Sequence, residues 1–253
     1  MIFRQLFEPD SSTYTYLLGC RDDGVAVLVD PVLESVERDL AALQALGLTL
    51  AFTIDTHIHA DHITSAARLR SLTGCKIAYA GADAPAEADF SVSETDPLDV
   101  GSVRVQPLFT PGHTESHHSY LIDVANAPKV LTGDALLIDG CGRTDFQNGD
   151  ADVLYRSVTQ KLFSLPEDVL VYPAHDYQDR RVSSIAQEKK RNPRLGEGRT
   201  LEEFREIMAK LDLPYPKFIE FAVPGNRQCG VCPPNLPDNL AGYCRQITES
   251  PQG

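Results

Sequence analysis

The sequence predicts an α/β protein in which helices cover both faces of a sheet layer. Short apolar runs of strand length alternate along the chain with longer segments whose apolar residues recur at helical spacing. At 253 residues, 42% of them hydrophobic, the chain can bury a sizeable core. No Gly-, Ser- or Pro-rich linker divides it. We therefore expect a single domain over residues 1–253, with about residues 178–253 as a C-terminal extension packed on the core.

Eight apolar runs are predicted as strands, in this order: 13–18, 25–29, 50–54, 76–80, 103–109, 119–122, 129–131 and 169–172. Five segments are predicted as helices: 35–46, 64–72, 151–165, 181–190 and 201–210. The first helix has the clearest pattern, because four apolar residues fall on one of its faces: Val36, Leu40, Leu43 and Leu46. Beyond about residue 178 the chain consists of charged helices and then a Pro-rich tail.

The charge balance excludes several classes of partner. Asp and Glu number 36 against 23 Lys and Arg, a formal charge of −13 without a basic patch, so we expect no nucleic-acid binding. The richest apolar stretch, 40–52, is interrupted by polar residues and Gly, so we expect no membrane span. The N-terminus shows neither a signal nor a transit pattern, and six scattered Cys form no disulfide framework. These features predict a cytoplasmic protein.

Polar residues follow the carboxyl ends of five predicted strands. They lie in five short segments: Asp30-Pro31, THIHADH (56–62), TPGHT around His113, TGDALL around Asp134 and YPAHDY around His175. Loops on a rigid sheet are where sites are built, so we expect these side chains to share one rim.

The densest cluster comprises His57, His59, Asp61 and His62. Imidazole nitrogen and carboxylate oxygen together suit Zn, Fe or Mn, whereas Ca and Mg prefer all-oxygen sites. An alternative is a solvated loop in which Asp61 or Thr64 caps the next helix. Capping explains one Asp or Thr but not three of the seven His in the chain, so the pattern favours a metal site.

The H-x-H-x-D-H cluster, followed in order by His113, Asp134 and His175, resembles the metallo-β-lactamase superfamily. The resemblance implies an αββα sandwich with metal at one edge of two facing sheets. Longer stretches are similar to the persulfide dioxygenase family (the ethylmalonic-encephalopathy protein family): THIHADHITS, TGDALLIDGCGRTDFQNGD, VYPAHDYQ, NPRL and FAVPGNRQCGV. The piece GCGRTDFQ discriminates best, since the related glyoxalase II shares a GCGR-like turn but does not usually continue as TDFQ.

The family resemblance implies one Fe(2+) per chain, held by His57, His113 and Asp134. A facial triad of two His and one carboxylate leaves three positions open, enough for a substrate sulfur, O2 and water. Binuclear hydrolases of the superfamily also use His59 and complete a second site with three further residues, all present here: Asp61, His62 and His175. These four residues therefore belong either to a second metal site or to the partners that orient the ligands.

The resemblance implies an enzyme of sulfide oxidation that converts glutathione persulfide, O2 and water to glutathione and sulfite. The alternative is a binuclear thioester hydrolase like glyoxalase II, in which metal-bound hydroxide is the nucleophile. A metal-binding module without turnover is less supported, because structural zinc sites are usually closed and often thiolate-rich. The family also implies a homodimer.

Two residues are candidates for binding the substrate. The planar guanidinium of Arg143, in GCGRTDF, suits a glutathione carboxylate, or else it forms a structural ion pair with Asp145. Tyr177 either offers its hydroxyl to the substrate or packs in the core.

The remaining signals are weaker. Cys229 falls where the family has a cysteine, and its oxidation is a hypothesis for tuning activity. Cys229 and Cys232 form a lone C-x-x-C, which predicts unligated thiols in a surface loop. His117 and His118 depart from the family pattern. Strand alternation predicts that one points inward and the other outward, each as a structural histidine.

Overall fold

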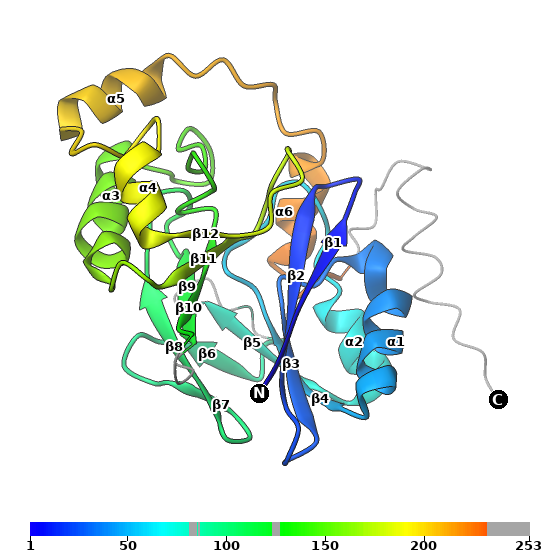
Figure 1. Cartoon of the computed structure of the whole chain (residues 1–253). Helices are drawn as coiled ribbons and strands as arrows, with labels where there is room; N and C mark the ends of the chain where they lie inside the picture. Colours follow the sequence, from blue (N-terminus) through cyan, green and yellow to red (C-terminus); the bar gives the residue numbers. More distant parts are fainter. Residues whose placement is uncertain (81–84, 86, 123–126, 232–253) are drawn as a thin grey trace.

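Two six-stranded sheets face each other in the computed structural model, which describes residues 1–80, 85, 87–122 and 127–231 (Figure 1). The first sheet has the order β1 (Ile2–Glu8), β2 (Thr13–Cys20), β3 (Val25–Val29), β4 (Thr49–Ile54), β5 (Lys76–Ala80) and β6 (Phe90–Val92). The second has the order β12 (Ser183–Ser184), β11 (Leu170–Pro173), β10 (Lys129–Gly133), β9 (His118–Ile122), β8 (Val103–Phe109) and β7 (Leu98–Val100).

Both sheets mix parallel and antiparallel pairs. In the first sheet, β1, β2 and β3 pair antiparallel, whereas β3 through β6 pair parallel. In the second, β7 through β10 pair antiparallel and β10 pairs parallel with β11. β8 and β10 are both antiparallel to β9, which lies between them, so they run in the same direction, and β11 is parallel to β10. The three strands β8, β10 and β11 therefore end at the same edge of the sheet. That edge carries the loops after residues 109, 133 and 173.

The main core lies between the two sheets. It is built from apolar side chains of both, for example Tyr16, Val27 and Ile54 from the first sheet with Tyr120 and Leu131 from the second. Because successive side chains on a strand point to opposite faces, the remaining apolar residues of the same strands need cover on the outside. The uninterrupted apolar runs in the sequence reflect strands that are buried on both faces.

Helices supply that outer cover. On the first sheet, Leu17 and Leu28 pack with residues of α1 (Val36–Leu46) and α2 (Ala66–Thr73). The short η1 (Leu33–Ser35) directly precedes α1. On the second, Val130 and Val171 pack with a layer comprising α3 (Ala151–Arg156), η3 (Ser157–Lys161), η4 (Leu162–Ser164), α4 (Ile185–Arg191) and α5 (Leu201–Ala209). The expected αββα sandwich is confirmed. None of the described helices is long and apolar enough to cross a membrane.

The chain returns to the first sheet with α6 (Ile219–Asn226), which lies beside α2 (Figure 1). Val223 and Cys229 pack there against Ala66, Ile77 and Tyr79, in a small apolar cluster of their own. Residues 219–229 therefore lie against the segment that follows β4, where the histidine cluster is located.

Several predicted boundaries need correction. β3, β5 and β8 have the predicted bounds, but β1, β6, β7, β12 and α6 were not predicted. The helix expected from Arg181 begins only at Ile185, because Ser183–Ser184 pairs with β11 and the Ser184 hydroxyl caps the helix by accepting from the Gln187 N–H. The helix expected over 151–165 is α-helical only to Arg156 and then continues through a π turn and a 3-10 turn.

Candidate metal centre

Three strand ends bring His57, His113 and Asp134 together. One side-chain donor atom from each lies within 4.8 Å of the donor atoms of the other two. His57 follows β4, His113 follows β8 and Asp134 directly follows β10. We call these three residues the triad. The sequence prediction that they share one rim is confirmed by this convergence.

The His57 ring is oriented from behind by a hydroxyl and a carboxylate. The Thr56 hydroxyl donates to Asp30 Oδ2 over 3.1 Å, so it accepts at 2.9 Å from His57 Nδ1. Nδ1 therefore carries the ring proton and Nε2 is left as a ligand atom. Burial, together with four neighbouring histidines, holds the pKa of His57 well below its ordinary value, so the ring is neutral.

The His113 ring is oriented by a backbone carbonyl. Its Nδ1 donates to the Arg143 carbonyl over 2.6 Å, and its Nε2 lies 3.7 Å from Asp134 Oδ2. The loop that carries Arg143 approaches closely, since a Cβ on Gly142 would lie 2.7 Å from His113 Nδ1. The GCGR turn thus fixes which nitrogen of His113 faces the centre.

Asp134 supplies the carboxylate of the triad. Its Oδ1 accepts at 2.7 Å from His175 Nδ1. Burial alone would raise the pKa of Asp134, but the charge and hydrogen bond of His175, with His113 nearby, hold it well below its usual range. The carboxylate is therefore ionised. Two imidazoles presenting Nε2 and one carboxylate form a donor set that fits a divalent transition metal.

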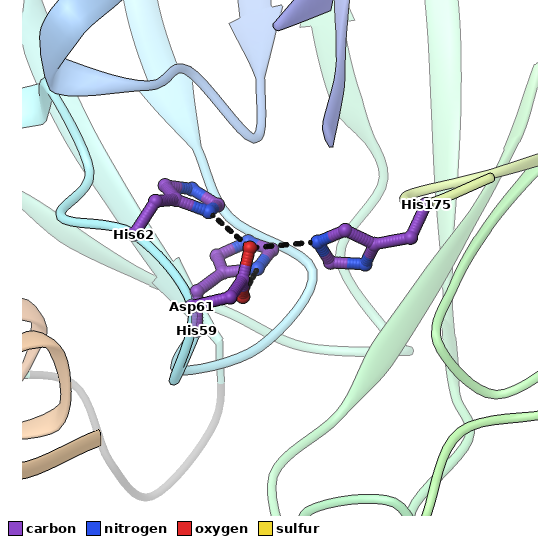
Figure 2. Close-up of side chains that lie close together, drawn as sticks. All are labelled: His59, Asp61, His62 and His175. Atoms are coloured by element: carbon purple, nitrogen blue, oxygen red, sulfur yellow. Dashed lines mark hydrogen bonds and ion pairs between the residues drawn. The ribbon is translucent and has the colours of Figure 1, made fainter. Parts of the chain in front are cut away.

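A second cluster adjoins the triad and comprises His59, Asp61, His62 and His175 (Figure 2). Asp61 Oδ2 accepts at 2.9 Å from both His62 Nδ1 and His175 Nε2. Burial disfavours a charged His175, but the carboxylates of Asp134 and Asp61 outweigh burial and raise the pKa of this ring well above its ordinary value. His175 is thus an imidazolium that links the two carboxylates.

Two ring nitrogens of the second cluster have no hydrogen-bond partner among the described residues. His59 donates from Nε2 to Asp30 Oδ1 over 3.0 Å, and its buried Nδ1 is unpaired. The buried Nε2 of His62 is unpaired as well. These two atoms are the donors that a second metal ion would have available.

Asp30 and Asp55 lie beneath the histidine loop. Asp30 directly follows β3. It is fully buried and has positive φ (51°), and besides His59 it accepts from the backbone N–H and the hydroxyl of Thr56. Burial and the neighbouring Asp30 raise the pKa of Asp55 to about 8. Asp55 thus holds a proton at neutral pH, while Asp30 orients two histidines.

Asn226 ties the C-terminal helix to the histidine loop, a role not anticipated from the sequence. Its side-chain NH2 donates to the carbonyls of His59 and His62, each over 2.9 Å, and its Oδ1 accepts from the Thr64 N–H over 2.8 Å. The residue is 1% exposed. The tail motif FAVPGNRQCGV was the only signal in the sequence for this contact.

The two candidate substrate residues differ in availability. Arg143 forms a two-pronged ion pair with Asp145, at 2.7 Å for each bond, and also donates to the Pro214 carbonyl over 2.8 Å. The structural alternative for Arg143 is therefore present in the fold. Tyr177 is 72% exposed and stacks on the His175 ring at 6.3 Å, so the alternative that it packs in the core is wrong.

Cys229 is fully buried and has positive φ (57°). Burial raises the pKa of its thiol to about 12, so it stays protonated, which argues against the hypothesis of a redox-sensitive thiolate. It lies in the turn 227–230, where Arg227 and Gln228 are exposed but the Cys229 side chain is buried. The expected partner of the C-x-x-C, Cys232, lies outside the described residues.

His117 and His118 are both buried, so the expectation that one faces outward is wrong. The cause is that both faces of the second sheet are covered. Each is hydrogen-bonded as a structural histidine should be: His117 through Thr110 and His118 through the Ser116 carbonyl.

Comparisons with known proteins agree with this geometry. The family model of the Metallo-beta-lactamase superfamily matches residues 9–175. Two relatives named "Persulfide dioxygenase ETHE1, mitochondrial", from Bos taurus and Homo sapiens, are each 46% identical over 235 residues, 92% of this chain and 91% of theirs. The crystal structure of ETHE1 from Myxococcus xanthus superposes with a TM-score of 0.87 at 52% identity, over 91% of this chain and 100% of that chain.

Proposed function

The chain belongs to the metallo-beta-lactamase superfamily and, within it, to the persulfide dioxygenases, and we propose that it oxidises glutathione persulfide at one Fe(2+) held by the triad. The overall reaction takes up O2 and water and yields glutathione and sulfite. The observation that carries the proposal is the convergence of His57, His113 and Asp134, with both imidazoles fixed to present Nε2.

The triad residues would hold the iron through two nitrogens and one oxygen, and so would leave coordination positions for ligands other than protein. Bound iron supplies the redox chemistry that O2 needs and a site for a soft sulfur donor. The chain's own part is to fix which nitrogen of each ligand imidazole carries the proton. Asp30 and Thr56 do this for His57, and the Arg143 carbonyl does it for His113.

His175 has a separate role in the proposed site. It holds a proton on Nδ1 against Asp134 Oδ1, over 2.7 Å, and another on Nε2 against Asp61 Oδ2, over 2.9 Å. The Asp134 carboxylate is thereby oriented and kept from rotating. In the proposed enzyme His59, Asp61, His62 and His175 support the triad rather than hold a second ion.

Two residues are candidates for binding the glutathione part of the substrate. The exposed hydroxyl of Tyr177 is available beside the second cluster. Arg143 would bind a substrate carboxylate only by exchanging it for Asp145, which occupies its guanidinium. A raised KM for glutathione persulfide with unchanged kcat in Tyr177→Phe or Arg143→Gln supports these roles, and unchanged KM contradicts them.

A glyoxalase II-like binuclear thioester hydrolase is the second candidate. The unpaired Nδ1 of His59 and Nε2 of His62 favour it, since a second ion would give both atoms a partner. The identities reported above favour the dioxygenase.

Metal analysis of the purified protein, combined with O2 uptake on glutathione persulfide, tests the proposal. We expect one iron per chain, with sulfite formed as O2 is consumed. Two metal ions per chain, with hydrolysis of S-lactoylglutathione and no O2 uptake, would overturn it. Protein stripped of metal and reloaded with zinc is the control, because zinc occupies the same donors but is redox-inert.

Two expectations about the cellular setting stay predictions. The names of the bovine and human relatives include the word mitochondrial, which differs from the cytoplasmic location expected for this chain. Fractionating cells of the source organism tests that expectation. The expected homodimer is tested by light scattering of the purified chain.

A further inference from the structure

We infer that His117 is a positioning residue for the triad, holding the backbone of Asp134 and packing against the ring of His57. The inference rests on the proposed metal site at the triad. His117 is fully buried, and neither of its ring nitrogens is free to bind an ion, because both are hydrogen-bonded to the protein. It therefore acts through its neighbours.

The hydrogen bonds of His117 have a defined direction. The backbone N–H of Asp134 donates to His117 Nε2 over 3.1 Å, so that nitrogen carries no proton. The proton is on Nδ1, which lies 2.9 Å from the Thr110 hydroxyl oxygen. That hydroxyl can then donate to Ser119 Oγ, also 2.9 Å away. One neutral tautomer satisfies every group in this chain of contacts.

The ring of His117 also contacts the imidazoles of the triad. It stacks on His57 with 5.2 Å between ring centroids and 23° between planes. It lies edge-on to His113 at 6.3 Å and 79°. His117 thus contacts or adjoins all three segments that form the triad. A ring in this place limits how far His57 can turn away from Asp134.

Gly133 permits the close approach of His117. The residue has positive φ (52°), and a Cβ there would lie 2.4 Å from His117 Nε2 and 2.8 Å from Thr56 Oγ1. Glycine is required both by the backbone conformation and by the space that the ring occupies. The glycine that precedes the triad carboxylate is therefore matched to the histidine that holds its backbone.

A residue that merely fills space would be replaced equally well by any side chain of similar volume. A positioning role depends instead on an acceptor at the place of Nε2. His117→Gln keeps such an acceptor, whereas His117→Phe keeps a flat ring but loses it. The two variants therefore separate hydrogen bonding from packing.

The experiment measures the dissociation constant of Fe(2+) without substrate, by competition with a chelator, for the whole chain and both variants. We expect His117→Phe to weaken iron binding about 10- to 100-fold, the usual effect of losing a partner that orients a ligand. His117→Gln should recover most of that loss. Equal affinities of the wild type and His117→Phe would overturn the inference, as would equal losses in the two variants.

Thr110→Val serves if His117→Phe does not fold. It removes the acceptor of His117 Nδ1–H and so releases the tautomer while keeping the ring. We expect a measurable loss of iron affinity, smaller than that from removing a ligand, and an unchanged affinity would overturn the inference. Failure of the proposed function gives a different result. In that case the wild-type protein itself shows no iron binding at the triad, whereas failure of the inference alone leaves wild-type binding intact.

Discussion

The triad and the second cluster lie side by side at one edge of the sandwich, yet they use the same residue types in different ways. In the triad, both imidazoles donate from Nδ1 to oxygens outside it, which are Thr56 Oγ1 and the Arg143 carbonyl. In the second cluster, His62 and His175 both direct a ring nitrogen at Asp61 of the same cluster. Both triad imidazoles therefore present Nε2 to one point. In the second cluster His62 and His175 pair with Asp61, and among the described residues His59 Nδ1 and His62 Nε2 stay unpaired.

The difference shows that residue type and spacing alone do not distinguish the two clusters. The partners behind the rings do, because they fix which nitrogen carries the proton. Charge follows the same division. His57 is held neutral by burial, whereas His175 is held charged between Asp134 of the triad and Asp61 of its own cluster. The imidazolium of the second cluster thus also faces the triad carboxylate.

The largest expected effect separates two histidines that lie two positions apart on one loop. His57→Ala should lose iron and lower kcat/KM at least about 1000-fold, because a metal contributes several kcal/mol to the barrier. His59→Ala, equally buried, should keep one iron per chain and lose no more than about tenfold. Metal analysis and O2 uptake measure both. If His59→Ala loses iron as completely as His57→Ala, the distinction between the clusters fails.

Asn226→Ala should lower stability without changing the triad. The substitution leaves two buried carbonyls and one buried N–H of the histidine loop unpaired, so we expect the free energy of unfolding to fall by about 3 kcal/mol. Denaturant unfolding of the metal-free protein measures this. Iron affinity of the folded variant should stay near wild type, because the bonded backbone groups belong to His59, His62 and Thr64. An affinity loss like that of His57→Ala would show that the two clusters act as one.

Thr56→Val should weaken iron binding about 10- to 100-fold while leaving the ligands in place. The hydroxyl fixes the proton on His57 Nδ1, and without it Nε2 is no longer reserved for the metal. Chelator competition measures the change. Iron affinity equal to that of the wild type would show that burial alone sets the tautomer.

Thr13→Val is the matched change in the second cluster and should have the smallest effect. The Thr13 hydroxyl lies 3.1 Å from His175 Nε2 and 3.3 Å from His62 Nδ1, at the far side of the cluster from the triad. We expect iron affinity to change by less than about threefold, which corresponds to under about 0.7 kcal/mol. A loss matching that of Thr56→Val would mean that the second cluster also holds metal.

The fold was predictable where the pattern is clean. Apolar runs predicted the bounds of β3, β5 and β8 to the residue, and strand ends predicted that His57, His113 and Asp134 share one rim. The choice of these three as a ligand set came from the family resemblance. β1 was missed because its burial does not alternate, and α6 because Pro224 and Gly225 disfavour a helix. Such segments adopt their secondary structure because of tertiary packing, although their local sequence does not favour it. Periodicity in the sequence therefore cannot reveal them.

The supporting residues of the site were not predictable for a related reason. Asn226 reaches carbonyls 164 and 167 positions earlier in the chain, and Asp30 accepts from a residue 26 positions later. Nothing in the local sequence marks these bonds. Thr56 and His117 differ from other buried polar residues only in their hydrogen-bond partners. Those partners are brought to them by tertiary packing.

Anomalous diffraction at the iron edge from crystals of the iron-loaded protein tests the central claim most directly. We predict one peak per chain, bounded by His57 Nε2, His113 Nε2 and the Asp134 carboxylate, with His59, Asp61 and His62 making no bond to it. Two peaks about 3.5–4 Å apart, the second bound by Asp61, His62 and His175, would contradict the account.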